Sequence, residues 1–292
     1  MKIAIFGKQF NDNYDSIVYN LLTKLSNCNI ELFIHRSFFE YLVHQKNFRF
    51  DFNGFYNTCE NMPSDIEFLL SIGGDGTFLE AITFIRDSGI PIVGINSGRL
   101  GFLANIAGSE VDKALDDLLS KNYTIEERSV LQLTSSESLF SDFPFAFNEC
   151  TIQKIGSSLI TIHVYIDGVF LNSYWTDGLI ISTPTGSTAY SLSVGGPIVT
   201  PQSRNFIISP IAPHNLNVRP LIIPDSSNLT LTVEGRTDSF LVTLDSRSVT
   251  SNVNTEITLS KGSFPVRMIK LPTIDFYTTL RNKLMWGVDK RN

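Results

Sequence analysis

The spacing of apolar residues divides the chain near residue 125 into two parts of different character. Before that point, short apolar runs alternate with segments whose apolar residues recur every three or four positions, which predicts strands alternating with helices. The predicted strands are Ile3–Phe6, Ile30–Phe33, Phe68–Ile72 and Ile90–Ile95; the predicted helices cover residues 17–25, 78–85 and 111–119; and residues 45–64 are predicted to form an irregular loop. This alternation is typical of an α/β domain with a mostly parallel sheet.

After residue 125, short β-branched runs with alternating polarity predict an all-β domain. Its predicted strands are Phe143–Phe147, Leu159–Ile166, Val169–Trp175, Leu179–Ser182, Leu229–Val233, Phe240–Leu244 and Ile257–Leu259, with one short helix at Thr188–Ser193. The last segment returns to helical spacing at Phe276, Leu280 and Leu284. We therefore predict an α/β domain of residues 1–125, joined by a C-terminal helix within residues 272–292, and a β-rich domain of residues 126–271.

Composition narrows the class of protein. The chain has 292 residues and a net charge of −6, which disfavours nucleic acid as a partner. No secretion signal is expected, because the apolar run Met1–Phe6 is too short for one. No membrane span is expected either, because the one long uncharged stretch, residues 178–203, contains several prolines. The three cysteines, Cys28, Cys59 and Cys150, are scattered, which favours free thiols in a reducing cytoplasm. The four histidines show no spacing typical of metal ligands.

A glycine-rich turn, Gly73-Gly74-Asp75-Gly76-Thr77, lies between a predicted strand and a predicted helix. Its glycines let a phosphate approach the backbone closely, and Asp75 could take a proton from a hydroxyl nucleophile. Thr77 is a candidate cap for the helix. The ordinary structural alternative is a strand–helix turn in which Asp75 caps the helix.

A second corner covers residues 177–193, where an apolar strand meets a proline and a glycine before the short helix. Ser187 or Thr188 is the expected N-cap, and the free N–H groups of such a corner suit an anionic ligand. Tyr190 adds an aromatic face, and Asp177 adds a carboxylate. A tight turn built from small residues is the structural alternative.

Two familiar nucleotide-binding motifs are missing from the sequence. It contains no Gly-x-x-x-x-Gly-Lys-Ser/Thr, so a P-loop mechanism has no support. The glycines of residues 94–101 have the wrong spacing for a dinucleotide fingerprint, which disfavours a hydride-transferring Rossmann enzyme.

Three motifs together carry a resemblance. The glycine-rich turn, the pair Asn148-Glu149 and the 177–193 corner occur in the order found in NAD kinases, and residues 94–103 match a Gly-x-Asn-x-Gly-x-Leu-Gly-Phe-Leu segment of that family. From about residue 65 to the C-terminus the chain resembles the NAD kinase family. The glycine-rich turn alone also resembles those of diacylglycerol, sphingosine and 6-phosphofructokinases.

The resemblance implies transfer of the γ-phosphoryl group of ATP to the adenosine 2′-hydroxyl of NAD, with a divalent cation that we expect to be Mg²⁺. It also implies that the C-terminal helix packs on the N-terminal domain, and that the protein is a homodimer or homotetramer. Asp75 is the implied base. The residues implied or suggested to bind NAD are Asp75, Gly76, Phe102, Asn148, Glu149, Asp177, Thr188, Ala189, Tyr190, Ser191, Leu192, Ser193 and Ala212. Those implied to bind ATP are Gly73, Gly74, Thr77 and Asn96. No residue is assigned to the metal.

Arg247 departs from the family, which often has glutamine at this position of a turn near the nucleotide pocket. It is either an exposed turn arginine or a guanidinium that binds phosphate oxygens of NAD or NADP. Two other functions stay open: a lipid kinase of the diacylglycerol type, which residues 183–190 disfavour, and a pyridine-nucleotide sensor without turnover, which an intact Asp75 disfavours.

Overall fold

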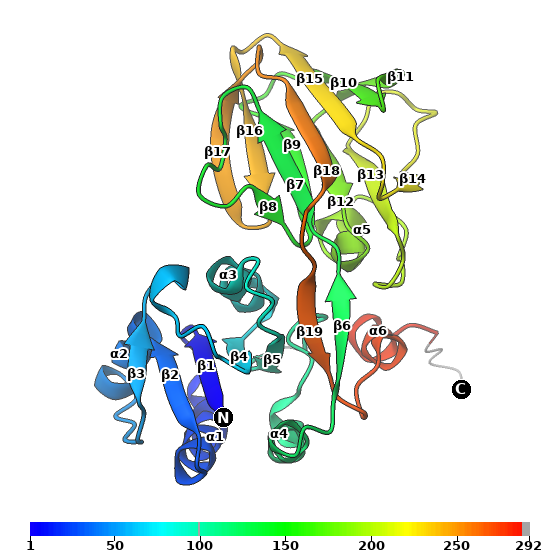
Figure 1. The fold of residues 1–292 in the computed structure, drawn as a ribbon. Helices are drawn as coiled ribbons and strands as arrows, with labels where there is room; N and C mark the ends of the chain where they lie inside the picture. The colour runs from blue at the N-terminus through cyan, green and yellow to red at the C-terminus, as the bar shows by residue number, and fades with distance from the viewer. Residues whose placement is uncertain (99, 288–292) are drawn as a thin grey trace. The chain divides into compact units, whose positions relative to one another are not determined.

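The computed structural model describes residues 1–98 and 100–287. It divides into two compact units, one formed by residues 1–127 and 266–292 and the other by residues 128–265 (Figure 1). Residues 288–292 of the predicted C-terminal helix and Arg99 lie outside the described residues. Among the described residues, no helix is long and apolar enough to cross a membrane.

The first unit is built on a seven-stranded sheet in the order β3-β2-β1-β4-β5-β19-β6. Its strands are β1 (Lys2–Gly7), β2 (Glu31–His35), β3 (Gly54–Tyr56), β4 (Phe68–Gly73), β5 (Ile92–Asn96), β6 (Thr124–Arg128) and β19 (Val266–Lys270). The pairs β1–β2, β2–β3, β1–β4, β4–β5 and β5–β19 are parallel. The predicted α/β class with a mostly parallel sheet is confirmed.

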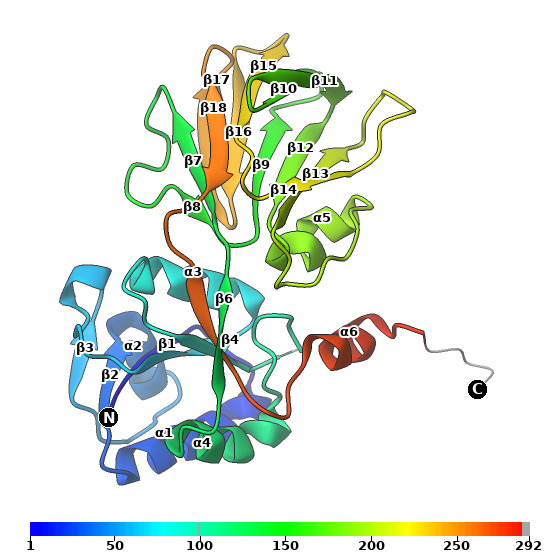
Figure 2. The same ribbon diagram turned by 45° about the vertical axis from the view of Figure 1, so that its right-hand side comes forward.

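Helices cover this sheet because their apolar residues form continuous stripes. The helices are α1 (Asp15–Asn27), α2 (Arg36–His44), α3 (Asp75–Ile85), α4 (Val111–Leu119) and α6 (Phe276–Leu284), with short 3₁₀ turns at Asp12–Tyr14, Cys59–Asn61 and Gly108–Glu110. Residues of α1, α2 and α4 share one apolar core with the sheet. Figure 2 shows α1 and α4 beside each other on one face and α3 on the other.

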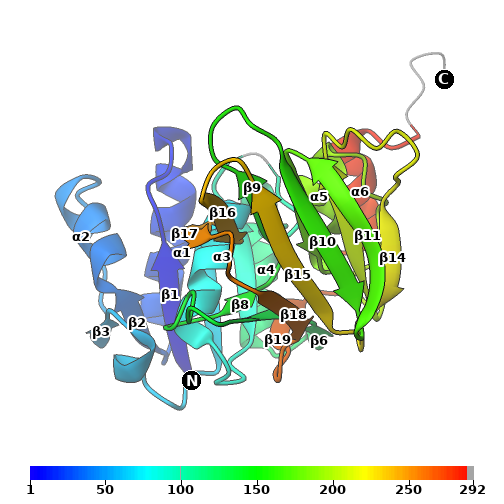
Figure 3. The same cartoon turned by 90° about the horizontal axis from the view of Figure 1, so that it is seen from above.

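The second unit contains two six-stranded antiparallel sheets that enclose a single core. The first has the order β11-β10-β15-β18-β7-β8, with β7 (Leu131–Ser135), β8 (Phe145–Ala146), β10 (Ile160–Ile166), β11 (Val169–Thr176), β15 (Leu229–Gly235) and β18 (Ile257–Lys261). The second has the order β14-β13-β12-β9-β16-β17, with β9 (Glu149–Lys154), β12 (Gly178–Ser182), β13 (Asn205–Ile211), β14 (Leu221–Pro224), β16 (Ser239–Leu244) and β17 (Arg247–Asn252). Figure 3 shows β11, β10 and β15 side by side. The predicted all-β class is confirmed.

Some local predictions differ from the structure. Residues 36–44 form α2, and the predicted loop at 45–64 contains β3 and a 3₁₀ turn. The segment 266–271, assigned to the β-rich domain from its sequence, contains β19, which belongs to the sheet of the first unit. The short helix is split into a 3₁₀ turn at Thr185–Thr188 and α5 at Tyr190–Ser193.

Candidate active site

In the first unit, Asp75 is the first residue of α3, directly beyond the C-terminal end of β4. Its Oδ1 accepts hydrogen bonds from the backbone N–H groups of Leu103 and Ala104, each at 3.0 Å, and its Oδ2 accepts one from Phe102 at 3.0 Å. The Lys283 ammonium on α6 lies 3.5 Å from Oδ2. The carboxylate is therefore oriented by the 102–104 loop, and Oδ2 has the weaker set of partners.

The three glycines of the turn differ in their surroundings. A Cβ on Gly73 would overlap the side chain of Thr77, so Gly73 is required for packing within the turn. A Cβ on Gly74 or Gly76 would meet nothing within 4 Å among the described residues. The fold does not need glycine at these two positions, and the space above them is open to a ligand.

The cap predictions for this turn are wrong. Thr77 lies inside α3, whose N-cap is Gly74, and no side chain bonds the N-cap position. Asp75 does not cap the helix either, because its carboxylate is engaged by the 102–104 loop. The glycine-rich turn gives α3 an open N-terminus, at which no side chain of the described residues forms a cap hydrogen bond.

Asn96 and Phe102 support the same loop. Asn96, at the end of β5, is buried; its Nδ2 donates to the carbonyl of Ala104 at 3.2 Å, and its Oδ1 accepts from the N–H of Gly98 at 2.7 Å. The ring of Phe102 lies 6.3 Å from that of Phe276 on α6 and 4.9 Å from the Lys283 ammonium. In this structure both residues organise the loop that holds Asp75.

In the second unit, Asn148 and Glu149 lie where β8 leads into β9, and both side chains are buried. The carboxylate of Asp245 accepts hydrogen bonds from the N–H groups of Phe147 (2.8 Å), Asn148 (2.7 Å) and Glu149 (3.2 Å). The Asp245 N–H donates in return to the Glu149 carbonyl at 3.0 Å. Asp245 thus fixes the backbone of the pair from the neighbouring turn.

Two buried oxygens of this pair have no hydrogen-bond partner among the described residues: Asn148 Oδ1 and Glu149 Oε2. Burial, together with the charge of Asp245, raises the pKa of Glu149 to about 8, against the opposing effect of the Tyr190 N–H. Burial also raises the pKa of Asp245, although the three N–H donors and Arg247 oppose the shift. Buried polar atoms without partners are costly, so they indicate a place where a ligand supplies the missing hydrogen-bond partners.

The part of the 177–193 corner that follows β12, residues 183–193, packs directly on the Asn148-Glu149 pair. The Thr183 hydroxyl donates to the Phe147 carbonyl at 2.6 Å, and its N–H donates to the Asn148 carbonyl at 2.9 Å. A Cβ on Gly186 would overlap the same Asn148 carbonyl, so this close approach requires glycine. The corner and the Asn148-Glu149 pair therefore form one structural assembly.

The predicted caps of this corner are also wrong. The Ser187 hydroxyl donates to the carbonyl of Val199 and accepts from its N–H, both at 3.1 Å, while the Thr188 hydroxyl donates to the Thr185 carbonyl. Ser191 bonds Ser209 at 2.9 Å through their hydroxyls. Of the remaining predicted ligands here, Ala189 and Leu192 are half-buried and Ser193 is exposed.

The N-terminal end of β12, at Gly178, lies away from Glu149, which pairs with Ser182 at the other end of the strand. Near this N-terminal end are Asp177, Ala212 and the hydroxyl group of Tyr190. The Lys154 ammonium pairs with Asp177 Oδ1 at 2.5 Å, and Asp177 donates its N–H to the Ile211 carbonyl at 3.1 Å. Ala212 follows with a φ of 45°, an uncommon backbone conformation for alanine. Tyr190 is partly exposed, and its hydroxyl accepts from Gln153 at 3.1 Å.

Comparisons with known proteins identify the family. Residues 3–123 match the model of the ATP-NAD kinase N-terminal domain, and residues 147–271 match that of the ATP-NAD kinase C-terminal domain. The chain is 48% identical to the NAD kinase of Cytophaga hutchinsonii and 46% identical to that of Flavobacterium psychrophilum, with 100% of each chain covered in both cases. The chain belongs to the NAD kinase family.

Solved structures of the NAD kinase family share the fold. An NAD kinase from Archaeoglobus fulgidus in complex with ATP has a TM-score of 0.73 and 25% identity, covering 98% of this chain and 99% of that one. Yeast NADH kinase complexed with NADH has a TM-score of 0.84 at 23% identity, covering 99% of this chain and 89% of that one.

The contacts of Arg247 do not match the interpretation of this residue as an exposed turn arginine. Its guanidinium donates to the backbone carbonyl of Phe143 at 2.5 Å and to that of Phe145, and it lies 5.1 Å from the Phe143 ring. It is therefore neither a solvated turn arginine nor a free cation. Its role in binding phosphate stays a prediction.

Two functional residues were not predicted from the sequence: Asp245, which holds the backbone of Asn148 and Glu149, and Lys283, which faces Asp75. Asp245 lies in a turn 96 positions after Glu149, so local patterns could not connect the two. Its place two residues before Arg247, in the turn that Sequence analysis puts near the nucleotide pocket, was the available signal. Lys283 offered none, because a lysine on an exposed helix is ordinary.

Proposed function

We propose that this protein transfers the γ-phosphoryl group of ATP to the adenosine 2′-hydroxyl of NAD, giving NADP and ADP. The observation that carries the proposal is the match to NAD kinases over the whole chain, together with the glycine-rich turn that presents Asp75. Neither the lipid kinase nor the non-catalytic sensor has a corresponding observation in its favour.

The proposed chemistry assigns Asp75 as the base. The 2′-oxygen attacks the γ-phosphorus, the bond from that phosphorus to the β–γ bridging oxygen breaks, and the proton of the 2′-hydroxyl passes to the carboxylate. Oδ2 is the better acceptor, because Oδ1 already accepts two backbone N–H groups, whereas Oδ2 accepts one and faces Lys283 at the longer distance of 3.5 Å. The 2′-hydroxyl would replace Lys283 as the second donor to Oδ2.

The open space over Gly74 supports its assignment to the triphosphate, since a phosphate could approach the backbone there without a clash. Gly76, which was assigned to NAD, is equally open. Gly73 and Thr77 pack on each other and would support the turn. Asn96 would support it through the 102–104 loop. Phosphoryl transfer depends mainly on this kind of alignment and on charge neutralisation.

For NAD, we propose contacts from Asn148, Glu149, Asp177, residues 188–193 and Ala212. The unpartnered Asn148 Oδ1 and Glu149 Oε2 support this assignment most directly. The adenine amino group can donate to Asn148 Oδ1, and a ribose oxygen can accept from Glu149, whose raised pKa keeps it protonated at neutral pH. Gly76, Phe102 and Arg247 are further candidates for NAD binding. The contacts described for Phe102 and Arg247 are with other parts of the protein, so NAD would bind beside those contacts or replace them.

A divalent cation, for which we propose Mg²⁺, would neutralise the triphosphate and polarise its γ-phosphoryl group. Among the described residues, no group of three or more His, Cys, Asp or Glu side chains could hold a metal. We propose that Mg²⁺ is held chiefly by phosphate oxygens and water, the usual arrangement for the ion in kinases.

We further propose a cytoplasmic homo-oligomer. The three free cysteines support a reducing compartment. Apolar side chains are exposed on the edge strands β11 and β14, which is unusual for a surface in contact only with water. These side chains are Val169, Phe170, Trp175, Leu221 and Ile222. Light scattering after size exclusion would measure the assembly.

The deciding experiment is an assay of the purified protein with ATP, Mg²⁺ and either NAD or diacylglycerol. We expect NADP and ADP in equal amounts from NAD and no product from the lipid. Lipid phosphorylation, or tight NAD binding without turnover, would replace the proposal with one of its two alternatives.

A further inference from the structure

The C-terminal helix α6 brings a cation to the carboxylate that the proposed reaction uses as its base. The Lys283 ammonium lies 3.5 Å from Asp75 Oδ2, and its side chain is 32% exposed. The chemistry assigned to Asp75 gives the 2′-hydroxyl of NAD the place that Lys283 holds on Oδ2. Lys283 therefore needs another partner in the reacting complex.

The position of Lys283 follows from the sequence of α6. Phe276, Leu280 and Lys283 recur at intervals of four and three residues, so they share one face of the helix. Leu280 is buried, and the Phe276 ring lies 6.3 Å from that of Phe102 in the loop that holds Asp75. The face that anchors α6 thus carries Lys283 to the same loop, where its ammonium lies 4.9 Å from the centre of the Phe102 ring.

The contacts of this ammonium are weak enough to be exchanged. Its distance of 3.5 Å to Oδ2 is long for a hydrogen bond between charged groups, which is usually about 2.7–2.9 Å. Its contact with the Phe102 ring uses no hydrogen-bond acceptor. Because lysine has three N–H donors and a flexible four-carbon stem, the ammonium can turn to a stronger acceptor that comes within reach.

The transferring phosphoryl group comes within that reach. A 2′-hydroxyl that gives its proton to Oδ2 lies about 2.6–3.2 Å from it. The 2′-oxygen must lie about 3–3.5 Å from the γ-phosphorus to attack it. The γ-phosphorus is then within about 7 Å of Oδ2, the atom beside which the ammonium lies. A rotation of the lysine stem suffices to bring the ammonium from the carboxylate to a phosphoryl oxygen.

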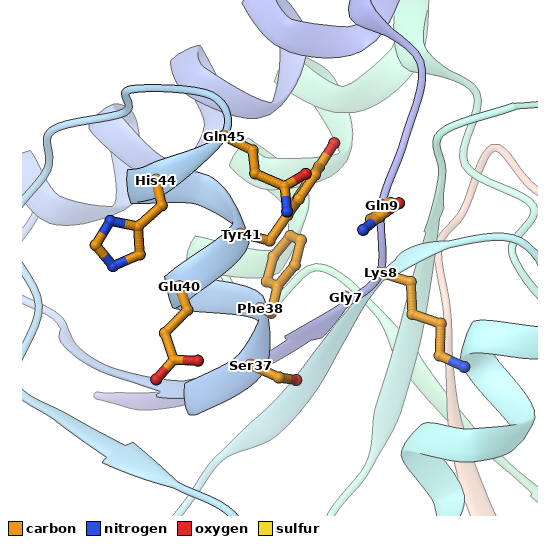
Figure 4. Close-up of a pocket in the computed structure, with 9 residues that line it drawn as sticks. All are labelled: Gly7, Lys8, Gln9, Ser37, Phe38, Glu40, Tyr41, His44 and Gln45. Carbon is orange, nitrogen blue, oxygen red and sulfur yellow. The ribbon is translucent and has the colours of Figure 1, made fainter.

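Lys8 also lies near the glycine-rich turn, but its ammonium has a different partner. It follows β1, the strand next to β4 in the sheet. Its ammonium forms an ion pair with Glu80, further along α3, and Figure 4 shows its side chain directed away from α2. Of these two lysines, Lys283 is the one that contacts the base.

We propose that Lys283 is a second catalytic residue, which pairs with Asp75 in the free protein and binds an oxygen of the γ-phosphoryl group during its transfer. The 2′-oxygen bonds to the γ-phosphorus, the bond to the β–γ bridging oxygen breaks, and the 2′-hydroxyl proton passes to Oδ2. This proton neutralises Asp75, so the carboxyl group releases the ammonium when charge on the phosphoryl group must be stabilised. Lys283 keeps its own proton throughout. The inference rests on the proposed function, because it adds a residue to that reaction.

Lys283→Met tests the proposal, because methionine keeps an apolar stem and removes the charge. Loss of this cation from the transferring group should lower kcat by about 10²- to 10³-fold, with the KM for NAD nearly unchanged. Lys283→Arg keeps the charge and should recover most of the lost activity. Arg281→Met is the matched control: it removes another cation of α6, whose guanidinium donates to the Thr278 hydroxyl at 2.9 Å, and it should retain kcat.

Calorimetry in an Asp75→Asn background separates action on the phosphoryl group from action through Asp75. Dissociation constants are measured for ATP and for ADP, each with Mg²⁺, before and after Lys283→Met is added. ATP should bind about tenfold more weakly, the loss of one bond to a charged group. ADP, which lacks the γ-phosphoryl group, should bind nearly as before.

Equal kcat values in Lys283→Met and Arg281→Met would overturn the proposal. So would equal losses of affinity for ATP and ADP, or no loss for either, because Lys283 would then act through Asp75 alone. Failure of the proposed function is distinguishable from both, since it would appear in the unsubstituted protein as no NADP formed from ATP and NAD.

Discussion

Two aspartates in this chain do the same structural work in different units. Asp75 accepts hydrogen bonds from three N–H groups of residues 102–104, and Asp245 accepts from three of residues 147–149. Charge-assisted bonds of this kind are strong and directional. The two aspartates differ in which atoms remain free to bind a substrate. Asp75 keeps its own Oδ2 accessible to a substrate hydroxyl, whereas next to Asp245 it is the side-chain oxygens of Asn148 and Glu149 that lack partners among the described residues.

The base assignment predicts the behaviour of Asp75→Asn. The amide preserves the size and part of the hydrogen bonding but cannot take the proton, so turnover should fall by about 10²- to 10⁴-fold. The NAD dissociation constant, measured by calorimetry, should change little. Near-normal turnover would leave Asp75 as the anchor of the 102–104 loop alone.

The raised pKa of Glu149 predicts pH-dependent NAD binding. With a pKa of about 8 the carboxyl is protonated at neutral pH and can donate to the nucleotide. NAD affinity should therefore be constant below pH 8 and fall as the pH rises through it. Glu149→Gln, which keeps a donor at every pH, should bind NAD with no such fall between pH 7 and 9.5.

Asp245→Asn separates the two causes of that shift. It removes the charge that raises the pKa of Glu149 but leaves its burial, so the fall in NAD affinity should begin at lower pH than in the unsubstituted protein. Identical pH profiles for the two proteins would show that the charge of Asp245 has no part in nucleotide binding.

At the scale of elements, the 98–104 loop connects the end of β5 to the carboxylate at the start of α3. A Cβ on Gly101 would overlap Asp75 Oδ1, whereas a Cβ on Gly98 in the same loop would meet nothing within 4 Å. The loop can therefore hold Asp75 only with glycine at position 101.

Gly101→Ala should accordingly lower kcat far more than it lowers the melting temperature, because the added methyl group displaces the loop from a half-exposed carboxylate and leaves the cores intact. Gly98→Ala is the control and should retain kcat. Equal activity in the two variants would mean that the loop does not need to reach Asp75.

Sequence periodicity predicted elements with clear local signals. The strands of the parallel sheet and the β-rich half were predictable because apolar runs and alternation reflect burial directly. β9 was missed because its polar residues, including Glu149 and Thr151, are buried in the sheet. The capping hydroxyls were misassigned because Ser187 and Thr188 bond other carbonyls, a choice set by tertiary structure.

The candidate residues were predictable as motifs, but their geometry was not. Local sequence indicated the glycine-rich turn and the 177–193 corner. It could not show that Asp75 receives the N–H groups of a loop 27 positions away, or that Asp245 supports Glu149 across 96 positions. Such contacts depend on which strands become neighbours, and the order of strands is a property of the whole fold.

At the scale of the whole molecule, the charge of −6 opposes the approach of a triphosphate, so the reaction needs local compensation. Backbone N–H groups at the start of α3 would supply part of it. Mg²⁺ in kinase sites is usually bound by substrate phosphates together with one or two carboxylates, so we propose that the cation enters with the donor and not with NAD.

Removing the metal tests whether the cation binds with the donor and not with NAD. Excess EDTA should abolish NADP formation from ATP, and an excess of Mg²⁺ over the chelator should restore it. The rise in melting temperature that NAD causes by binding the folded state should be the same with and without EDTA, because the proposed NAD contacts of Asn148, Glu149 and Asp177 use no metal. If EDTA also removed the stabilisation by NAD, the cation would have to bind with the acceptor, and the assignment of its ligands to the triphosphate would be wrong.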